Sequence, residues 1–283
     1  MIVLYLCIVF STAVQSVTTK LYSKKNDDVI LFNAIKSLSA LLIFIIMIFA
    51  GFSVHFPTML YGLFYGIMMC VSMYCGYMAL AIGPMALTSM IVSFSVAMPI
   101  LFGVTFCREK LNMFNIVGFV FLVAAVALAY CKSGKRTDNK LISNKWTLYV
   151  LLTFMSNGFC SIIQKLHQIN NKSAYYTEFM LSAMLVCSAF FIIFSLNRMN
   201  LSKMVKSNGK MYAVVSGLAN AIAGYITIKL AGTENASVLF PAISAGTLIA
   251  SLVCGILIFK EKLKYNHIVS IIFGISAVIF LKI

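Results

Sequence analysis

Long apolar runs, separated by short polar connections, recur along the whole chain. Each run is long enough for an α-helix, which rises about 1.5 Å per residue, to cross a bilayer core of about 30 Å. The pattern therefore predicts ten membrane-spanning helices and leaves no stretch for a soluble domain. Their approximate ranges are 1–19, 29–49, 57–82, 84–107, 112–131, 146–164, 174–196, 210–230, 236–259 and 265–281.

Polar positions that repeat in the same order indicate that the chain is a duplication. The tetrapeptide Arg108-Glu109-Lys110-Leu111 lies between two apolar runs and returns as Lys260-Glu261-Lys262-Leu263. We therefore predict a five-helix repeat over residues 1–131, a basic connecting loop over 132–145 and a second five-helix repeat over 146–283. Further matches pair Ser11, Ser16 and Lys20 with Ser156, Ser161 and Lys165, and pair Tyr61, Gly66 and Tyr74 with Tyr212, Gly217 and Tyr225.

An odd number of crossings in each repeat places the second copy upside down in the membrane. We therefore expect an all-α integral membrane protein built from two inverted five-helix repeats, related by an axis in the membrane plane. This construction is typical of secondary transporters, whose substrates bind near the bilayer midplane between the halves. The alternative is a duplicated membrane protein without a transport role.

The composition supports a membrane protein and excludes other classes. Of the 283 residues, 61% are hydrophobic and 10% are charged, whereas about a quarter of the residues in soluble domains are charged. The net charge of +15 comes from lysine and arginine residues scattered through short connections, so we expect no nucleic-acid partner. The cysteines are isolated, and His55, His167 and His267 fall at predicted helix ends as interfacial residues. We expect no metal site, no cofactor and no enzymatic activity.

The order of these features resembles the EamA branch of the drug/metabolite transporter superfamily. The resemblance rests on the two five-helix repeats, on Pro99 in an apolar fourth helix, and on Glu109-x-Leu111 before a glycine-containing fifth helix. It implies a ten-helix carrier in which helices five and ten are peripheral and the other eight surround a central cavity. Two positions depart from the family pattern. Pro241 lies ten places before Ser251, which matches Pro99, and the basic residue of helix two is here Lys36.

Lys36 is the charged residue placed deepest in a predicted helix, about seven residues or roughly 10 Å from its start. A lysine at the centre of a membrane helix costs about 2.5–3.5 kcal/mol, and such residues usually face a cavity or a partner. The alternative is that its long stem returns the ammonium to the interface. Asn33, Lys36, Ser37 and Ala40 share one face at i, i+3, i+4 and i+7, which favours contact with a substrate.

Glu178 lies about four residues into the seventh predicted helix, the repeat partner of the second. Inversion places it near the opposite membrane surface from Lys36. The separation along the membrane normal is about 14 Å in a core of about 30 Å, too far for a salt bridge. Glu178 is therefore a candidate carrier of a proton or another coupling ion, and the alternative is an interfacial carboxylate.

Uncharged polar stripes at helical spacing indicate a polar interior, although small polar residues also serve helix packing in membranes. The stripes are Ser11, Gln15 and Thr18; Asn157, Ser161 and Gln164; Ser216, Asn220, Gly224 and Thr227; and Ser237, Pro241, Ser244 and Ser251. Tyr74, Tyr77 and Tyr225 either line the same interior or lie near the membrane surface. The candidate substrate-binding residues are Asn33, Lys36, Ser37, Gln15, Tyr74, Asn157, Asn220, Tyr225 and Ser244.

These features predict a secondary active transporter that exports or takes up a small polar or amphipathic metabolite, such as an amino acid, by alternating access. We expect a multi-pass protein of the cell membrane, the plasma membrane of a bacterium, and leave open a coupling ion and an oligomer. The first alternative is a flippase for a lipid-linked sugar or another lipid-handling protein, and the second is multidrug efflux. The positive charge of Lys36 and the lack of a carboxylate predicted at mid-membrane depth favour an anionic or zwitterionic substrate over an organic cation.

Charge asymmetry predicts the orientation. Most lysine and arginine residues lie in the connections after helices one, three, five, seven and nine, so the positive-inside rule places both termini outside the cell. The family resemblance instead implies cytoplasmic termini. With Ser133→Cys as the reactive cysteine, we expect an impermeant thiol reagent to label the central connection only after the cells are permeabilised. Labelling in intact cells would contradict the charge-based orientation.

Overall fold

A computed structural model describes most of the chain, and all regular structure in the described residues is helical. Seven helices are long and apolar enough to cross a membrane, which agrees with a multi-pass membrane protein. Helix ten, the two repeated tetrapeptides apart from Lys260, and residues 132–143 of the connecting loop lie mainly or wholly outside the described residues. The described ranges are 2–24, 28–49, 55–83, 85–107, 112–131, 144–171, 174–198 and 209–260, with isolated positions between 269 and 280.

The observed helices follow the predicted apolar runs closely. In chain order they are α1 (Ile2–Ser23), α2 (Val29–Ile48), α3 (Phe56–Ile82), α4 (Met85–Ser93), the short 3₁₀ helix η1 (Phe94–Val96), α5 (Ala97–Thr105), α6 (Met113–Cys131), α7 (Asn144–Asn170), α8 (Tyr176–Arg198), α10 (Lys210–Ala231) and α11 (Ala236–Leu257). Long exposed apolar side chains cover the outside of the bundle, as expected for a surface that faces lipid.

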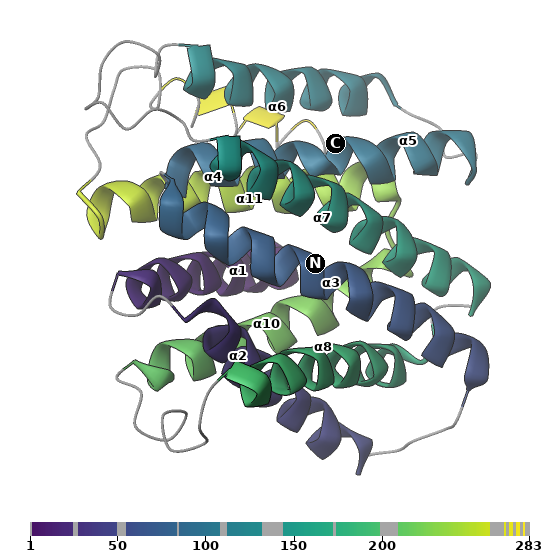
Figure 1. Cartoon of the computed structure of the whole chain (residues 1–283). Helices are drawn as coiled ribbons and strands as arrows, with labels where there is room; N and C mark the ends of the chain where they lie inside the picture. The colour runs from purple at the N-terminus through teal and green to yellow at the C-terminus, as the bar shows by residue number, and fades with distance from the viewer. Residues whose placement is uncertain are drawn as a thin grey trace.

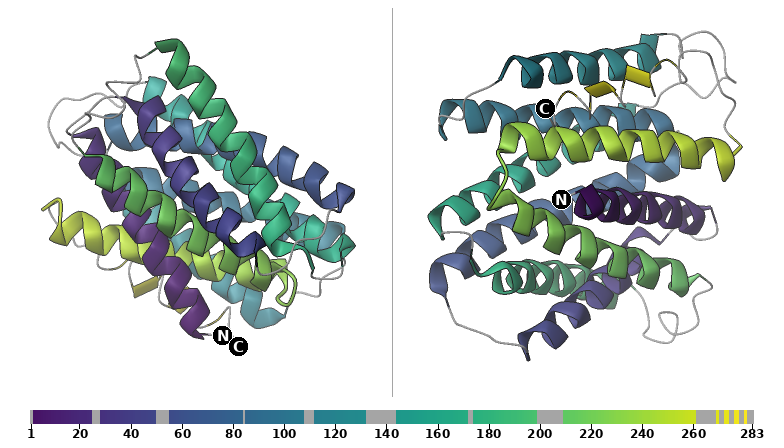
Figure 2. Two further views of the ribbon diagram at one scale, coloured as in Figure 1. Left: turned by 90° about the horizontal axis from the view of Figure 1, so that it is seen from below. Right: turned by 180° about the vertical axis from the view of Figure 1, so that it is seen from behind.

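The helices pack side by side into one bundle (Figure 1). α1 packs on α10 and α11, α3 packs on α7 and α8, and α2 packs on α8 and α10. Seen from the front and from behind, α6 lies at one edge of the bundle, and α2 and α8 lie at the opposite edge (Figure 2).

The fourth predicted helix is divided into three parts, α4, η1 and α5. Pro99 has no N–H to donate to the carbonyl of Ser95, and the hydrogen-bond ladder changes to 3₁₀ geometry just before it. α11 instead runs through Pro241 without a break. The two matching segments therefore differ in shape, in line with the different places of their prolines.

α7 continues to Asn170, beyond the predicted end at residue 164. The extra turns pack against the start of α3, and they carry His167 and Gln168 into the protein interior, where these residues are 0% and 1% exposed. The expectation that His167 is an interfacial residue is therefore wrong. His55 caps the start of α3 as expected for a residue at a helix end, and His267 lies outside the described residues.

Two close helix crossings depend on glycine. A Cβ atom on Gly217 of α10 would lie 2.2 Å from the backbone carbonyl oxygen of Lys36 in α2. A Cβ atom on Gly66 of α3 would lie 2.9 Å from the carbonyl oxygen of Ala183 in α8. Small residues let backbones approach at membrane helix interfaces, and these two glycines are matching positions of the predicted duplication.

We predict that Gly217→Ala destabilises the protein because α2 and α10 must move apart. Overpacking of this kind costs typically about 1–3 kcal/mol. The matched control is Gly76→Ala, whose added carbon would meet its nearest neighbour at an ordinary 3.5 Å. The melting temperature of the purified protein, measured by size-exclusion chromatography after heating, should fall clearly for Gly217→Ala and little for Gly76→Ala. Equal melting temperatures would show that the crossing tolerates a side chain.

Candidate functional site

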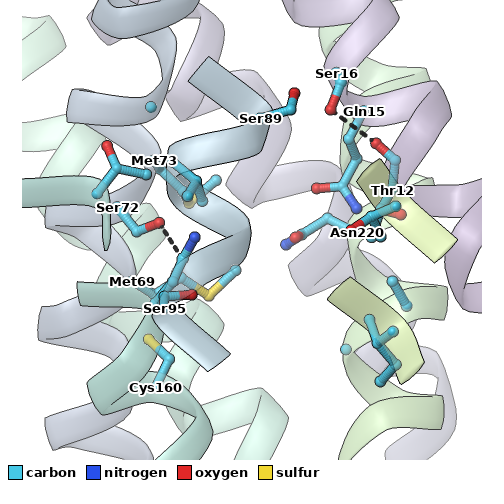
Figure 3. A pocket seen from close by; sticks show the side chains of 18 of the residues that line it. Thr12, Gln15, Ser16, Met69, Ser72, Met73, Ser89, Ser95, Cys160 and Asn220 are labelled. Carbon is cyan, nitrogen blue, oxygen red and sulfur yellow. Dashed lines mark hydrogen bonds between the residues drawn. The ribbon is translucent and has the colours of Figure 1, made fainter. Parts of the chain in front are cut away.

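A cavity of about 390 Å³ lies at the centre of the bundle. Its lining residues come from α1, α2, α3, α4, η1, α7, α10 and α11. In Figure 3, Ser72, Met73 and Cys160 on α3 and α7 lie across the cavity from Gln15 and Asn220 on α1 and α10. None of the lining residues in the described part of the chain comes from α8, although the family resemblance placed helix seven around the cavity.

Six of the nine candidate substrate-binding residues meet at this cavity, although they come from five helices in both halves of the chain. They are Gln15, Asn33, Lys36, Asn157, Asn220 and Ser244. Their common feature is a polar side chain on the face that each helix turns toward the centre of the bundle. The periodicity of the sequence was therefore sufficient to bring them together.

The other three candidates, Ser37, Tyr74 and Tyr225, do not belong to the cavity lining. Ser37 is fully buried against neighbouring helices, and its hydroxyl donates to a carbonyl of its own helix. Tyr74 lies edge-on to Tyr149, and Tyr225 lies edge-on to Tyr176, each with ring centroids 6.4 Å apart. These two tyrosines therefore serve packing between helices in this structure.

The polar face of α1 is turned by one position relative to the predicted stripe. Ser11 and Thr18 are buried in helix packing, whereas Thr12, Ser16 and Thr19 line the cavity beside Gln15. The prediction for this helix was therefore wrong by about 100° of rotation, the angle between neighbouring residues. Of the remaining stripe residues, those in the lining are Ser161, Gln164, Gly224, Thr227 and Ser251, and those outside it are Ser216, Ser237 and Pro241.

Three amide side chains in the lining are held in place by hydrogen bonds to α3. Such tethers fix the direction of each amide before any ligand arrives, which lowers the entropic cost of binding. The bonds are Ser72 Oγ to Asn157 Oδ1 at 2.6 Å, Gln164 Nε2 to the hydroxyl of Tyr65 at 3.2 Å, and Asn33 Nδ2 to the carbonyl of Met73 at 3.3 Å.

Eight hydroxyl groups of the lining donate their protons back to their own helices. Each bonds a carbonyl three or four positions earlier, so its remaining lone pairs are available to a ligand. The cavity therefore offers hydrogen-bond acceptors more than donors. The hydroxyls that bond in this way are those of Thr12, Ser16, Thr19, Ser93, Thr153, Ser161, Thr227 and Thr247.

Lys36 is the charged residue among the described residues of the lining, and it is 8% exposed. Within the described part of the chain, no hydrogen bond or ion pair joins its ammonium group to another residue. A cation in a cavity of low dielectric constant attracts an anion much more strongly than the same cation in water. The cavity therefore has one fixed positive charge surrounded by neutral acceptors.

Glu178 lies in the first turn of α8 and does not line the cavity. It is buried, whereas Lys36 lines the cavity. The role of Glu178 as a carrier of a proton or another coupling ion stays a prediction.

Sequence reasoning missed the contribution of the fourth helix to the cavity. Ser89, Ser93 and Ser95 line it from α4 and η1, and the i, i+4 spacing of the first two was a usable signal. Ser72 had no such signal, because its partner Asn157 lies 85 positions away in the other half.

Comparison with known proteins agrees with this geometry. Residues 1–131 match the model of the EamA-like transporter family. A solved structure described as "Crystal structure of protein" superposes with a TM-score of 0.73 at 13% sequence identity, over 98% of this chain and 94% of that chain. At this identity the likeness shows a shared fold alone. No curated protein matches the chain in sequence.

The face of α1 can be tested with neighbouring cysteines in a variant without its native cysteines. Thr12→Cys places a thiol in the cavity, whereas Ser11→Cys places one in helix packing. We expect a small hydrophilic thiol reagent to label position 12 at least about tenfold faster, because thiolate formation and attack both need water. Faster labelling at position 11 would mean that the predicted stripe, and not the observed one, faces water.

Proposed function

We propose that this protein, an EamA-type member of the drug/metabolite transporter superfamily, is a secondary active transporter that carries a small polar or amphipathic metabolite across the cell membrane by alternating access. The observation that carries the proposal is the polar cavity with a single lysine at the centre of an apolar bundle. A cavity of this kind costs stability in a membrane protein and is typical of a substrate site.

Two inverted repeats account for the way the helices pack. If helices one to five correspond to helices six to ten, the contact of α1 with α10 corresponds to that of α7 with α3. The contact of α3 with α8 likewise corresponds to that of α10 with α2. Gly66 and Gly217 occupy matching places in the last two contacts. The rings of Phe121 and Phe273, another matching pair, touch with centroids 5.3 Å apart.

A two-fold axis that passes between the repeats 1–131 and 146–283, with 132–145 as their connection, explains all these correspondences. Rocking of one repeat against the other would open the cavity to each side in turn, which is the usual mechanism of carriers with inverted repeats. Ten helices and this axis are part of the proposal.

The lining favours a zwitterionic substrate such as an amino acid. Lys36 provides the counter-charge for a carboxylate, and the hydroxyl oxygens provide acceptors for an ammonium group. Drug-sized ligands occupy pockets of about 300–1,000 Å³, so a cavity of about 390 Å³ suits a small metabolite. An exporter of organic cations would need a carboxylate in the lining, and the described lining residues include none. A flippase for a lipid-linked sugar would need a groove that opens sideways to lipid.

Radiolabelled amino acids, organic anions and organic cations, compared in bacterial cells that lack or overproduce the protein, test the proposed function. We expect the zwitterions to change most between the two strains. If only the cations respond, the protein is a cation exporter, and if only lipid-linked intermediates respond, it handles lipids.

Lys36→Met tests the proposed role of the ammonium group, because it removes the charge and keeps an unbranched stem. Loss of a charged hydrogen bond costs about 1.5–3 kcal/mol, so transport at low substrate concentration should fall by about tenfold to a hundredfold. The control is Lys229→Met, since Lys229 is exposed at the end of α10. Folded protein should accumulate normally in both variants.

Lys36→Arg tests whether the site depends on the shape of the ammonium group as well as on its charge. It keeps the charge but replaces a compact ammonium by a wide planar group, so partial loss would fit a shaped site. Normal transport by Lys36→Met at normal expression would remove Lys36 from the substrate site.

A further inference from the structure

A chain of hydrogen bonds joins two histidines at the end of the bundle where α3 begins and α7 ends. The hydroxyl of Thr58 lies 2.9 Å from Nδ1 of His55 and 3.0 Å from Nε2 of His167. Nε2 of Gln168 lies 2.7 Å from Nδ1 of His167. Thr58 and His167 are fully buried, and Gln168 is 1% exposed.

The chain of bonds is complete when both imidazoles are neutral. Gln168 donates to Nδ1 of His167, Nε2–H of His167 donates to Thr58, and the Thr58 hydroxyl donates to Nδ1 of His55. Rotation of the Gln168 amide allows the same chain to run in the opposite direction, again with two neutral rings. Oε1 of Gln168 is buried without a hydrogen-bond partner, so the amide has no other bond that resists this rotation.

An added proton has different consequences at the two histidines. If Nδ1 of His55 is protonated, it donates to Thr58 and the chain runs in the opposite direction, so every hydrogen bond is kept. If His167 is protonated, an imidazolium lies in a position that is 0% exposed, and burial of an ion costs more than one hydrogen bond returns. The closed seam of His55, Thr58, His167 and Gln168 therefore favours a neutral His167.

Residues from the start of α8 cover both rings. Tyr175 stacks on His55 with an interplanar angle of 2° and centroids 4.4 Å apart. Phe179 lies 4.6 Å from the ring of His167, and Tyr61 meets that ring edge-on at 5.6 Å. His55 is already partly exposed, whereas the ring of His167 can reach water only if the start of α8 moves away from α3 and α7.

The backbone of Tyr175 is strained in the covering position. Its φ is +58°, in the left-handed region that a bulky non-glycine residue rarely adopts. This conformation accompanies the stacking of the Tyr175 ring on His55.

The seam also leads to the cavity. Gln164 lies one turn before His167 and Gln168 on α7, and Tyr65 lies one turn after Tyr61 on α3. Gln164 and Tyr65 are hydrogen-bonded to each other, and both line the cavity. The seam therefore lies one helical turn away from two side chains of the proposed substrate site.

We propose that His167, hydrogen-bonded through Thr58 to His55, forms the proton-binding site of the carrier, which holds a neutral imidazole at His167 while this end is closed and takes up a proton there when it opens. The proposal rests on the proposed transport function and names its coupling ion. The other titratable or charged groups on the elements packed here are Tyr61 and Tyr65 of α3, Lys165 of α7, Tyr175, Tyr176 and Glu178 at the start of α8, and Lys229 and Glu234 beside the end of α10.

The sign of the pH dependence follows from linkage. A free imidazole titrates near pH 6.5, whereas the closed seam disfavours the charged form of His167. The closed form therefore has its full stability above about pH 7.5 and loses stability as the pH falls through about 6.5. At pH 5.5 the open fraction should rise about tenfold for each histidine that becomes protonated on opening.

Hydrogen–deuterium exchange of the purified full-length protein tests the proposal with the proton as the only ligand. After correction for the intrinsic effect of pH on exchange, the peptides around residues 55–61 and 167–179 should lose protection at pH 5.5 relative to pH 7.5. His167→Asn should remove most of this response, and His55→Asn with His167→Asn should abolish it. His267→Asn, which changes the third histidine of the chain, should leave it unchanged.

Thr58→Ser and Thr58→Val form a second pair in case the double variant does not fold. The serine variant keeps the hydroxyl and should keep the response, whereas the valine variant should already be less protected at pH 7.5. Equal protection of the unaltered protein at both pH values would overturn the proposal, and so would a pH response that survives in the double variant. This measurement needs no substrate, so its outcome is separate from the transport assays.

Discussion

The backbones of α2 and α10, and those of α3 and α8, come so close at glycines that an added Cβ atom would meet a backbone carbonyl oxygen. At the first crossing Gly217 lies against the carbonyl of Lys36, so this contact helps to place the turn of α2 that carries the lysine to the cavity. At the second crossing Gly66 lies against Ala183 of α8, the helix whose Phe179 covers the ring of His167. Lipid tails are as apolar as the helix surfaces, so the hydrophobic effect does not drive helix association within a membrane. Close backbone packing has to stabilise the association instead.

The polar groups of the cavity lining fall into two kinds, according to whether their hydrogen bonds cross between helices or stay within one helix. The amides of Asn33, Asn157 and Gln164 are tied across helices to α3, so they are part of the scaffold as well as of the cavity surface. Eight hydroxyls of the lining bond only carbonyls of their own helices, so their remaining lone pairs do not depend on the neighbouring helices. The proposed alternating access would benefit from this division, because these acceptors would remain when the helices move and the cross-helix bonds break.

The sequence allowed prediction of the helices and of most polar faces, because both follow from a period of 3.6 residues. The sequence did not predict the rotation of α1 about its own axis, nor the contacts between residues that are far apart in the chain. On α1, polar residues occupy adjacent positions, and periodicity did not distinguish Ser11 and Thr18 from Thr12, Ser16 and Thr19. The end of α7 was placed too early, and the bond between His167 and Thr58 joins residues 109 positions apart, so neither the burial of this histidine nor its partner followed from local pattern.

The proposed duplication would make the two ends of the bundle differ at the histidine seam. Because Lys20 matches Lys165 in the predicted repeat, Tyr22 matches His167, and it packs between Phe32 and Tyr77 at the end of α1. By the proposed correspondence of α3 with α10, Thr58 matches Gly209, which has no side chain to share a proton. On the proposed transport mechanism, the two ends would therefore have the same backbone architecture but different chemistry. A proton would favour opening at the histidine end alone, and a pH difference across the membrane would then bias the direction of transport.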